Sequence, residues 1–145
     1  MTSMGGRFSF AGVSAYSATK FALEGLSEAL AAEVAPFGIK VLIVEPGAFR
    51  TSFAGSGALL QSAAIPAYAD TVGPVRATLP STDGKQPGDP AKAAATILAA
   101  LDAEKTPLRL PLGNDAADAI STHLDNARAE FRAWESVARS TDFDD

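Results

Sequence analysis

Apolar residues recur at every fourth position along one stretch of the chain, between residues 15 and 36. The repeat consists of Ala22, Leu26, Leu30 and Val34, and Glu24, Glu28 and Glu33 lie off it. Such a repeat is typical of an amphipathic helix, and Pro36 and Gly38 are residues that end helices. We therefore expect a helix from Ala15 to about Pro36.

Two short apolar runs predict strands. Residues 39–44 are apolar except for Lys40, and their β-branched content is typical of a strand buried in a parallel sheet. Residues 108–112 form the second run, in which Pro111 lacks an N–H group and so favours the edge of a sheet. Because helices and strands alternate, we expect an α/β fold in which helices cover a parallel sheet.

The remaining segments predict further helices. Residues 47–88 are rich in Gly, Pro and Ser, and we expect short helices there over 57–63 and 67–79. Asp89 caps a helix that Pro90 begins and that runs to about Ala103. A last helix is expected from Asn114 or Asp115 to near Val137. Its two large aromatic residues, Phe131 and Trp134, are expected to pack against the body of the protein.

Composition narrows the class of protein. The chain has 145 residues, of which 47% are hydrophobic, and this favours one globular unit. A net charge of -5 argues against a nucleic-acid partner. No run of 18 apolar residues exists, so we expect no membrane span, and a cytoplasmic location is expected. The chain has no cysteine, and its aspartates lack the spacing of a calcium loop, so we expect no metal site.

The candidate chemistry lies near the start of the chain. Tyr16 and Lys20 are four residues apart, and Ser3 precedes the tyrosine by thirteen. Positions four apart lie on one face of a helix. An ammonium group beside a phenol favours the phenolate, which can exchange a proton with an alcohol or a carbonyl compound. A serine hydroxyl folded onto the same spot could hold the reacting oxygen, although such pairs also occur on helix surfaces that only face solvent.

Three stretches around these residues resemble the short-chain dehydrogenase/reductase family in its classical form. They are Ser3-Met4-Gly5-Gly6-Arg7, Gly12-Val13-Ser14-Ala15-Tyr16-Ser17-Ala18-Thr19-Lys20-Phe21-Ala22 and Val41-Leu42-Ile43-Val44-Glu45-Pro46-Gly47. The resemblance implies that Tyr16 is the general acid/base, that Lys20 is its partner and contacts the nicotinamide ribose, and that Ser3 binds the reacting oxygen. The implied reaction transfers hydride between NAD or NADP and an alcohol or carbonyl substrate.

The resemblance also implies roles for the segment that follows the second stretch. Pro46 and Gly47 match the turn beside the nicotinamide, and Thr51 matches the residue that contacts its carboxamide. Residues 48–88 match the family's substrate loop, which often forms a lid. Its apolar residues could line the substrate pocket or anchor the loop to the core. They are Phe49, Phe53, Leu59 and Tyr68.

One family motif is absent from the sequence. Members of the family begin with a strand and a glycine-rich turn that holds the pyrophosphate at a helix N-terminus. The candidates here, Gly5-Gly6 and Gly55-Ser56-Gly57, do not follow a strand and open a helix. We therefore expect the chain to be the C-terminal half of a doubly wound Rossmann-type sheet.

We treat residues 1–145 as a single partial domain with four segments. These are the serine loop (1–14), the tyrosine helix and its strand (15–47), the substrate loop (48–88) and a closing helix, edge strand and helix (89–145). Two alternatives to an oxidoreductase remain open. The chain could be an inactive fragment or pseudo-enzyme, or it could be a dimerisation module. In this family the helix over 15–36 commonly packs against its counterpart, so a homo-oligomer is expected.

Overall fold

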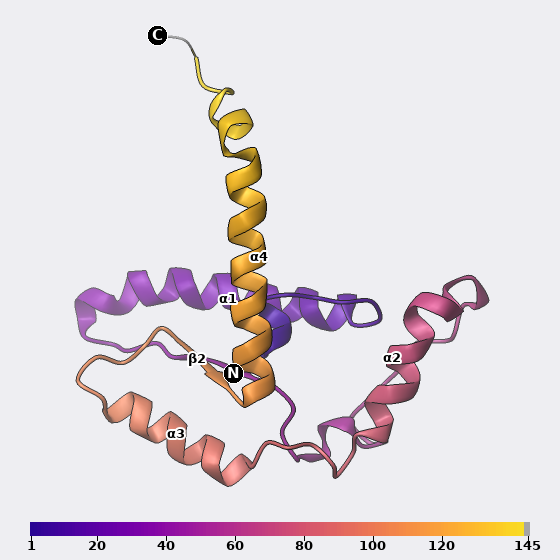
Figure 1. Cartoon of the computed structure of the whole chain (residues 1–145). Helices are drawn as coiled ribbons and strands as arrows, with labels where there is room; N and C mark the ends of the chain where they lie inside the picture. Colours follow the sequence, from indigo (N-terminus) through magenta and orange to yellow (C-terminus); the bar gives the residue numbers. More distant parts are fainter. Residues whose placement is uncertain (144–145) are drawn as a thin grey trace.

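The computed structural model describes residues 1–143 (Figure 1), so Asp144 and Asp145, the end of the expected closing segment, lie outside the described residues. Two strands, β1 (Ile43–Pro46) and β2 (Arg109–Leu112), form a parallel sheet. The register pairs Ile43 with Arg109 and Pro46 with Leu112. The expected α/β fold with a parallel sheet and covering helices is confirmed.

The first strand begins later than the sequence predicts. The apolar run over 39–44 predicts a strand there, but β1 begins at Ile43 and extends through Glu45 to Pro46. Pairing sets this start, because the first bond to the other strand runs from the Ile43 N–H to the Leu108 carbonyl, at 2.7 Å. Ile39 precedes the paired region and is 57% exposed.

The tyrosine helix, α1 (Ser14–Val34), confirms the predicted helix, and a short 3-10 helix, η2 (Ala35–Phe37), continues it. Its orientation is unusual for an amphipathic helix. Leu26 on the apolar repeat is 64% exposed, whereas Glu24 is 5% exposed. The helix therefore turns a polar face inward and leaves much of its apolar repeat uncovered.

The segment between the strands is only partly helical. The 3-10 helix η3 (Ser52–Ala54) begins after Thr51, whose side chain accepts the Phe53 N–H. The helix predicted over 57–63 is wrong: that segment, which contains Gly57, holds turns and irregular backbone. The helix predicted over 67–79 is confirmed as η4 (Pro66–Tyr68) followed by α2 (Ala69–Ser81).

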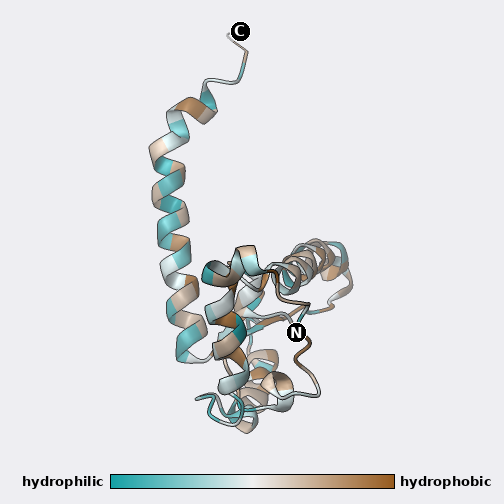
Figure 2. Ribbon diagram, turned by 90° about the vertical axis from the view of Figure 1, so that its right-hand side faces the viewer, coloured by the Kyte–Doolittle hydropathy of each residue, from teal (hydrophilic) through white to brown (hydrophobic). Residues whose placement is uncertain are grey.

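The last two helices lie where the sequence predicts them. Helix α3 (Pro90–Asp102) is capped by Asp89, whose side chain accepts the N–H groups of Ala91 and Lys92. Helix α4 (Asn114–Arg139) follows β2 directly. Its first turns pack on the sheet, and the rest projects away from the body (Figures 1 and 2). The buried apolar residues of the sheet and the helix base are Ile43, Val44, Leu112, Ala116 and Ile120.

The expectation that Phe131 and Trp134 pack against the body is wrong. Phe131 is 57% exposed and Trp134 is 65% exposed, because both lie on the projecting part of α4. The base of the helix is already covered by the sheet, so the outer turns have no body to pack against within residues 1–143.

Candidate active site

The serine loop is fixed against the end of β1. The Thr2 N–H donates to the Val44 carbonyl at 2.8 Å, so the start of the chain lies along the strand. A 3-10 helix, η1 (Met4–Gly6), follows, and the Ser3 hydroxyl caps it by accepting the Gly5 N–H at 3.1 Å. The same hydroxyl donates to the Pro46 carbonyl at 3.4 Å. Ser3 therefore joins η1 to the turn that follows β1.

Gly5 brings the serine and the tyrosine together. A Cβ atom on Gly5 would lie 3.2 Å from Cε1 of Tyr16 and 3.6 Å from Oγ of Ser3. The glycine is buried between the two side chains, so they meet across a residue that has no side chain of its own. The expected proximity of Ser3 and Tyr16 is thus present in the structure.

Lys20 lies on the same face of α1 as the tyrosine. Its Nζ atom lies 5.5 Å from the centre of the Tyr16 ring, and both side chains are half-buried. The ring of Phe53 lies 5.8 Å from the tyrosine ring. A cation and an aromatic residue from the substrate loop therefore flank the phenol.

The turn after β1 is held by residues from both ends of the chain. The Gly47 N–H donates to the Leu112 carbonyl at 2.9 Å. Asp115, at the start of α4, accepts the Ala48 N–H at 2.7 Å. A side chain on Gly47 would collide with the Asp115 carboxylate. Pro46 and Gly47 thus lie beside the serine loop, whereas Thr51 is engaged in capping η3.

The expected pocket residues do not form one group. Phe53 faces the tyrosine, but Phe49 packs on Gly88, where a Cβ atom would lie 2.6 Å from the phenylalanine ring. Leu59 is half-buried and Tyr68 is 58% exposed. An apolar hollow that the sequence did not predict lies between the serine loop and α2. It is lined by Phe10, Pro74, Val75, Thr78, Leu79 and Thr82.

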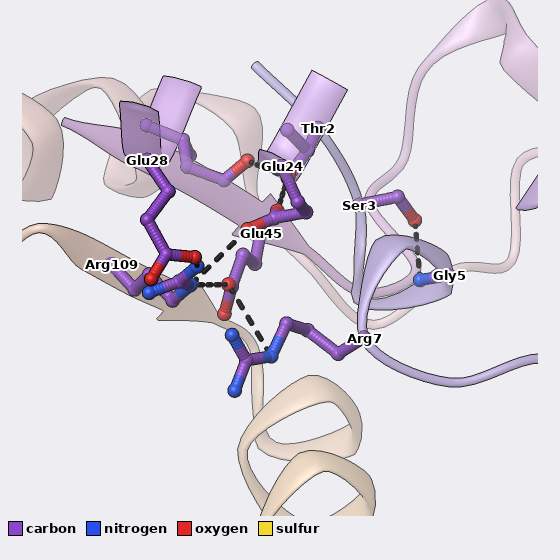
Figure 3. Close-up of polar contacts among 9 residues, drawn as sticks. Thr2, Ser3, Gly5, Arg7, Glu24, Glu28, Glu45 and Arg109 are labelled. Atoms are coloured by element: carbon purple, nitrogen blue, oxygen red, sulfur yellow. Dashed lines mark hydrogen bonds and ion pairs between the residues drawn. The ribbon is translucent and has the colours of Figure 1, made fainter. Parts of the chain in front are cut away.

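A buried cluster of charges lies around Glu45 of β1, near the start of the serine loop (Figure 3). Glu45 is fully buried in β1, and neither of its carboxyl oxygens has a hydrogen-bond partner among the described residues. Its nearest cations are Arg109, at 3.5 Å, and Arg7, at 3.8 Å. Arg109 also contacts Glu24 at 3.2 Å and Glu28 at 2.6 Å. The inward polar face of α1 is therefore satisfied by an arginine from β2.

Burial governs the ionisation of this cluster. Removal of Glu45 from water raises its pKa from 4.5 to about 7, and the negative charge of Glu24 acts in the same direction. The two arginines lower the pKa of Glu45 but do not offset its burial. The sequence contained one signal for this cluster, a glutamate at the end of an apolar run and directly before Pro46. The cluster itself could not be predicted, because the partners of Glu45 lie far apart along the chain.

The residues present fit one end of a nicotinamide dinucleotide. Among residues 1–143 no carboxylate lies within ion-pair distance of the Lys20 ammonium, so this cation can donate to a ribose hydroxyl. The described residues offer no site for the phosphate end of the dinucleotide. A Cβ atom on Gly6 would lie 3.0 Å from Cγ of Glu24, so this glycine serves packing on α1 and does not form a phosphate cradle.

Comparison with known proteins decides the family. A family model described as short chain dehydrogenase matches residues 1–58, which include Ser3, Tyr16, Lys20 and the Pro46-Gly47 turn. A solved structure, a short-chain dehydrogenase from Streptomyces avermitilis, is 65% identical, with a TM-score of 0.88 over 98% of this chain and 51% of that chain. The chain belongs to the short-chain dehydrogenase/reductase family. Its parallel sheet and covering helices are a fragment of that family's Rossmann-type fold.

Curated relatives of this short-chain dehydrogenase/reductase chain include two oxidoreductases. Oxidoreductase BOA17 from Botryotinia fuckeliana is 36% identical over 95% of this chain and 50% of its own length. The uncharacterized oxidoreductase YusZ from Bacillus subtilis is 33% identical over 96% of this chain and 50% of its own length. The chain therefore spans about half the length of these relatives.

Two features that the described residues lack bear on other functions. None of the helices in residues 1–143 combines the length and the apolar character needed to cross a membrane. The same residues contain no group of three or more His, Asp or Glu side chains placed to hold a metal ion.

Proposed function

We propose that this chain carries the acid/base half of an oxidoreductase that transfers hydride between NAD or NADP and an alcohol or carbonyl substrate. The single observation that carries the proposal is the meeting of Ser3 and Tyr16 across Gly5, with Lys20 beside the phenol. Three groups that can handle a proton and an oxygen atom converge there from two elements, the serine loop and α1.

Each of the three groups has a distinct task in the proposed reaction. The Ser3 hydroxyl orients the substrate oxygen: its single hydrogen turns to that oxygen from the Pro46 carbonyl, 3.4 Å away, while the hydroxyl still accepts the Gly5 N–H. The Tyr16 hydroxyl gives a proton to that oxygen in reduction and takes one in oxidation. The Lys20 ammonium, 5.5 Å from the centre of the Tyr16 ring, donates to the ribose of the cofactor. When bound, the dinucleotide supplies or accepts the hydride.

The cofactor and substrate sites are proposed in outline. Pro46 ends β1, Gly47 and Thr51 follow it, and the three would face the nicotinamide. Phe53 lies against Tyr16 and would contact the substrate, together with Phe49, Leu59 and Tyr68 where the loop closes over it. The pyrophosphate contacts would come from a segment outside these 145 residues, because no glycine-rich turn of the required kind occurs in them.

A chimera tests this proposal. The part of the Streptomyces avermitilis chain that this chain does not cover is joined to residues 1–145, and reduction of small ketones is followed by loss of NADH or NADPH absorbance. We expect turnover by the chimera. Tyr16→Phe should lower kcat by a factor of about 100 or more and leave dinucleotide affinity within a factor of about two. Glu33→Gln, which changes an exposed residue of the same helix, should have no such effect on kcat.

The outcomes are separable. If the Tyr16→Phe chimera keeps its turnover, Tyr16 is not the acid/base. If the unsubstituted chimera binds dinucleotide but reduces no ketone in the set, the chain is better described as an inactive pseudo-enzyme. The chain without the added segment is expected to bind the dinucleotide weakly, which a titration of its fluorescence would measure.

A second candidate function rests on the outward face of α1. Leu26 and Leu30 lie four residues apart on one face of α1 and are 64% and 42% exposed, so an apolar face is available to another molecule. A homo-oligomer that forms through this helix is proposed on that observation. Leu26→Glu should then lower the oligomeric state measured by light scattering, whereas Glu104→Gln, at an exposed position outside α1, should not.

A further inference from the structure

The outer half of α4 presents large apolar side chains to solvent. Leu124, Phe131, Trp134 and Val137 are 48%, 57%, 65% and 54% exposed. Two views at right angles show this part of the helix clear of the rest of the chain (Figures 1 and 2). An amphipathic helix with an uncovered apolar face is typical of an interaction surface.

The apolar positions of α4 follow the spacing of a coiled coil. They are Ala117, Ile120, Leu124, Ala127, Phe131, Trp134 and Ala138. The steps between them alternate between three and four residues over three heptads. This average period of 3.5 residues keeps the row of apolar side chains, the seam, facing a partner helix. An open hollow on the helix is lined by Ala127, Glu130, Phe131, Trp134 and Ala138, so the outer part of the seam is concave.

We infer that the outer half of α4 pairs with the same segment of a second copy of this chain, as an antiparallel coiled coil. The charges beside the seam select this partner and this direction. Arg128 and Glu135 each follow a seam residue and lie on one side of it, whereas Glu130 and Val137 each precede one and lie on the other side. In an antiparallel pair, like sides of the two seams face each other.

Antiparallel pairing places a charge of opposite sign against Arg128 twice, while Glu135 keeps its contact with Arg139 of its own helix at 2.7 Å. Arg128 of each copy lies opposite Glu135 of the other, so two attractive pairs border the seam. In a parallel pair, Glu130 of one copy would lie opposite Glu135 of the other, and two repulsive pairs would result. The antiparallel register also matches side-chain sizes, because Phe131 faces Trp134 of the second copy and Ala127 faces Ala138.

The pair is expected to be modest in strength. Residues 124–139 form a helix about 24 Å long, so each copy contributes only about two heptads outside the body. We expect a Kd on the order of 10 μM for the contact, typical of a small interface. This contact is separate from the outward face of α1 and does not depend on the reaction proposed above.

Trp134 reports on the seam directly, because it is the only tryptophan in the chain. With increasing concentration of the full chain, sedimentation equilibrium should show association, and the emission of Trp134 should shift to shorter wavelength as its ring leaves water. Ala127→Glu should abolish both changes while leaving the helix content measured by circular dichroism unaltered. An emission maximum that does not change with concentration would overturn the proposal.

Charge exchange tests the antiparallel direction. Arg128→Glu and Glu135→Arg should each raise the Kd of the contact by about tenfold, because each places like charges opposite one another twice. An equimolar mixture of the two variants should associate at least as tightly as the unsubstituted chain, because both pairs are then attractive. Arg132→Glu makes the same change of charge away from the seam and should leave the Kd unaltered.

Every other result counts against the proposal. Stronger association of Glu135→Arg alone would indicate a parallel pair, since Glu130 would then face an arginine. Equal Kd values for all variants would place the association elsewhere, such as on α1. A monomer at all concentrations would mean that α4 is left for another segment or another protein.

Discussion

The carboxylate of Asp115 fills the space beside Gly47 that a side chain would need. The same carboxylate accepts the Ala48 N–H at 2.7 Å. One residue at the start of α4 therefore holds the turn after β1, which also carries the carbonyl that accepts the Ser3 hydroxyl. The geometry of the candidate active site depends on this contact between Ala48 and Asp115, which are 67 residues apart in the sequence.

Gly47→Ala should destabilise the protein, because the added methyl group would displace the Asp115 carboxylate that accepts the Ala48 N–H. We expect a loss of about 1–3 kcal/mol in the free energy of unfolding, as for other overpacked sites. Urea denaturation would measure it. Gly57→Ala is a matched control, because a Cβ atom there meets nothing within 4 Å. Similar losses for both variants would show that the Asp115 contact is not the cause.

A second pair of glycines should respond in opposite directions. Gly6→Ala places a Cβ atom 3.1 Å from the Lys20 carbonyl oxygen, which cannot move without α1, so the variant should lose about 1 kcal/mol or more of stability. Gly25→Ala lies in the middle of α1 with open space around it and should gain about 0.5–1 kcal/mol from its higher helix propensity. Thermal denaturation of the two variants side by side would check the signs.

Glu45 should make stability depend on pH. Its pKa is about 7 in the folded protein and 4.5 ordinarily, so the folded state binds its proton more tightly. This contribution is fully present below pH 4.5 and is lost as the pH rises through 7. A difference of this size corresponds to about 3 kcal/mol at most. Urea denaturation from pH 5 to pH 8 should therefore show stability falling more steeply than in Glu45→Gln.

The matched control for this experiment is Glu33→Gln, which removes an exposed carboxylate from α1. It should keep the pH dependence of the unsubstituted chain. Equal slopes for Glu45→Gln and the unsubstituted chain would show that the Glu45 carboxyl does not change its protonation in this range.

Ser3→Ala should have two separable effects. Loss of the η1 cap should cost about 1 kcal/mol of stability, measured by urea denaturation. In the chimera, kcat should also fall, because nothing then orients the substrate oxygen. Ser3→Thr keeps a hydroxyl and should restore part of both quantities. A Ser3→Ala chimera with unchanged kcat would leave Ser3 with a capping role alone.

Local signals in the sequence predicted much of the fold. Asp89 and Pro90 fixed the start of α3, because capping depends on neighbours in the chain. The spacing of Tyr16 and Lys20 placed them on one helical face. The start of β1 at Ile43 could not be predicted in this way, because it is set by pairing with a segment more than 60 residues away.

The features that sequence reasoning missed depend on distant contacts. Glu45 acquires its shifted pKa from burial and from Glu24, and its cations come from the first loop and from β2. The amphipathic pattern of α4 predicted a helix correctly but could not indicate that its outer turns extend beyond the sheet. Phe131 and Trp134 are exposed because they lie on the part of α4 that extends beyond the sheet.

Proline in β2 determines which way the sheet can be enlarged. The carbonyls of Leu108 and Leu112 face β1, so alternation turns the backbone of Arg109 and Pro111 toward the outer edge. An added strand would find no N–H donor at Pro111, whereas β1 already accepts the Thr2 N–H along its other side. A further strand can therefore pair more readily on the side of Thr2. Pro111 disfavours the pairing of another chain with the outer edge of β2, which is the step that leads to edge-to-edge aggregation.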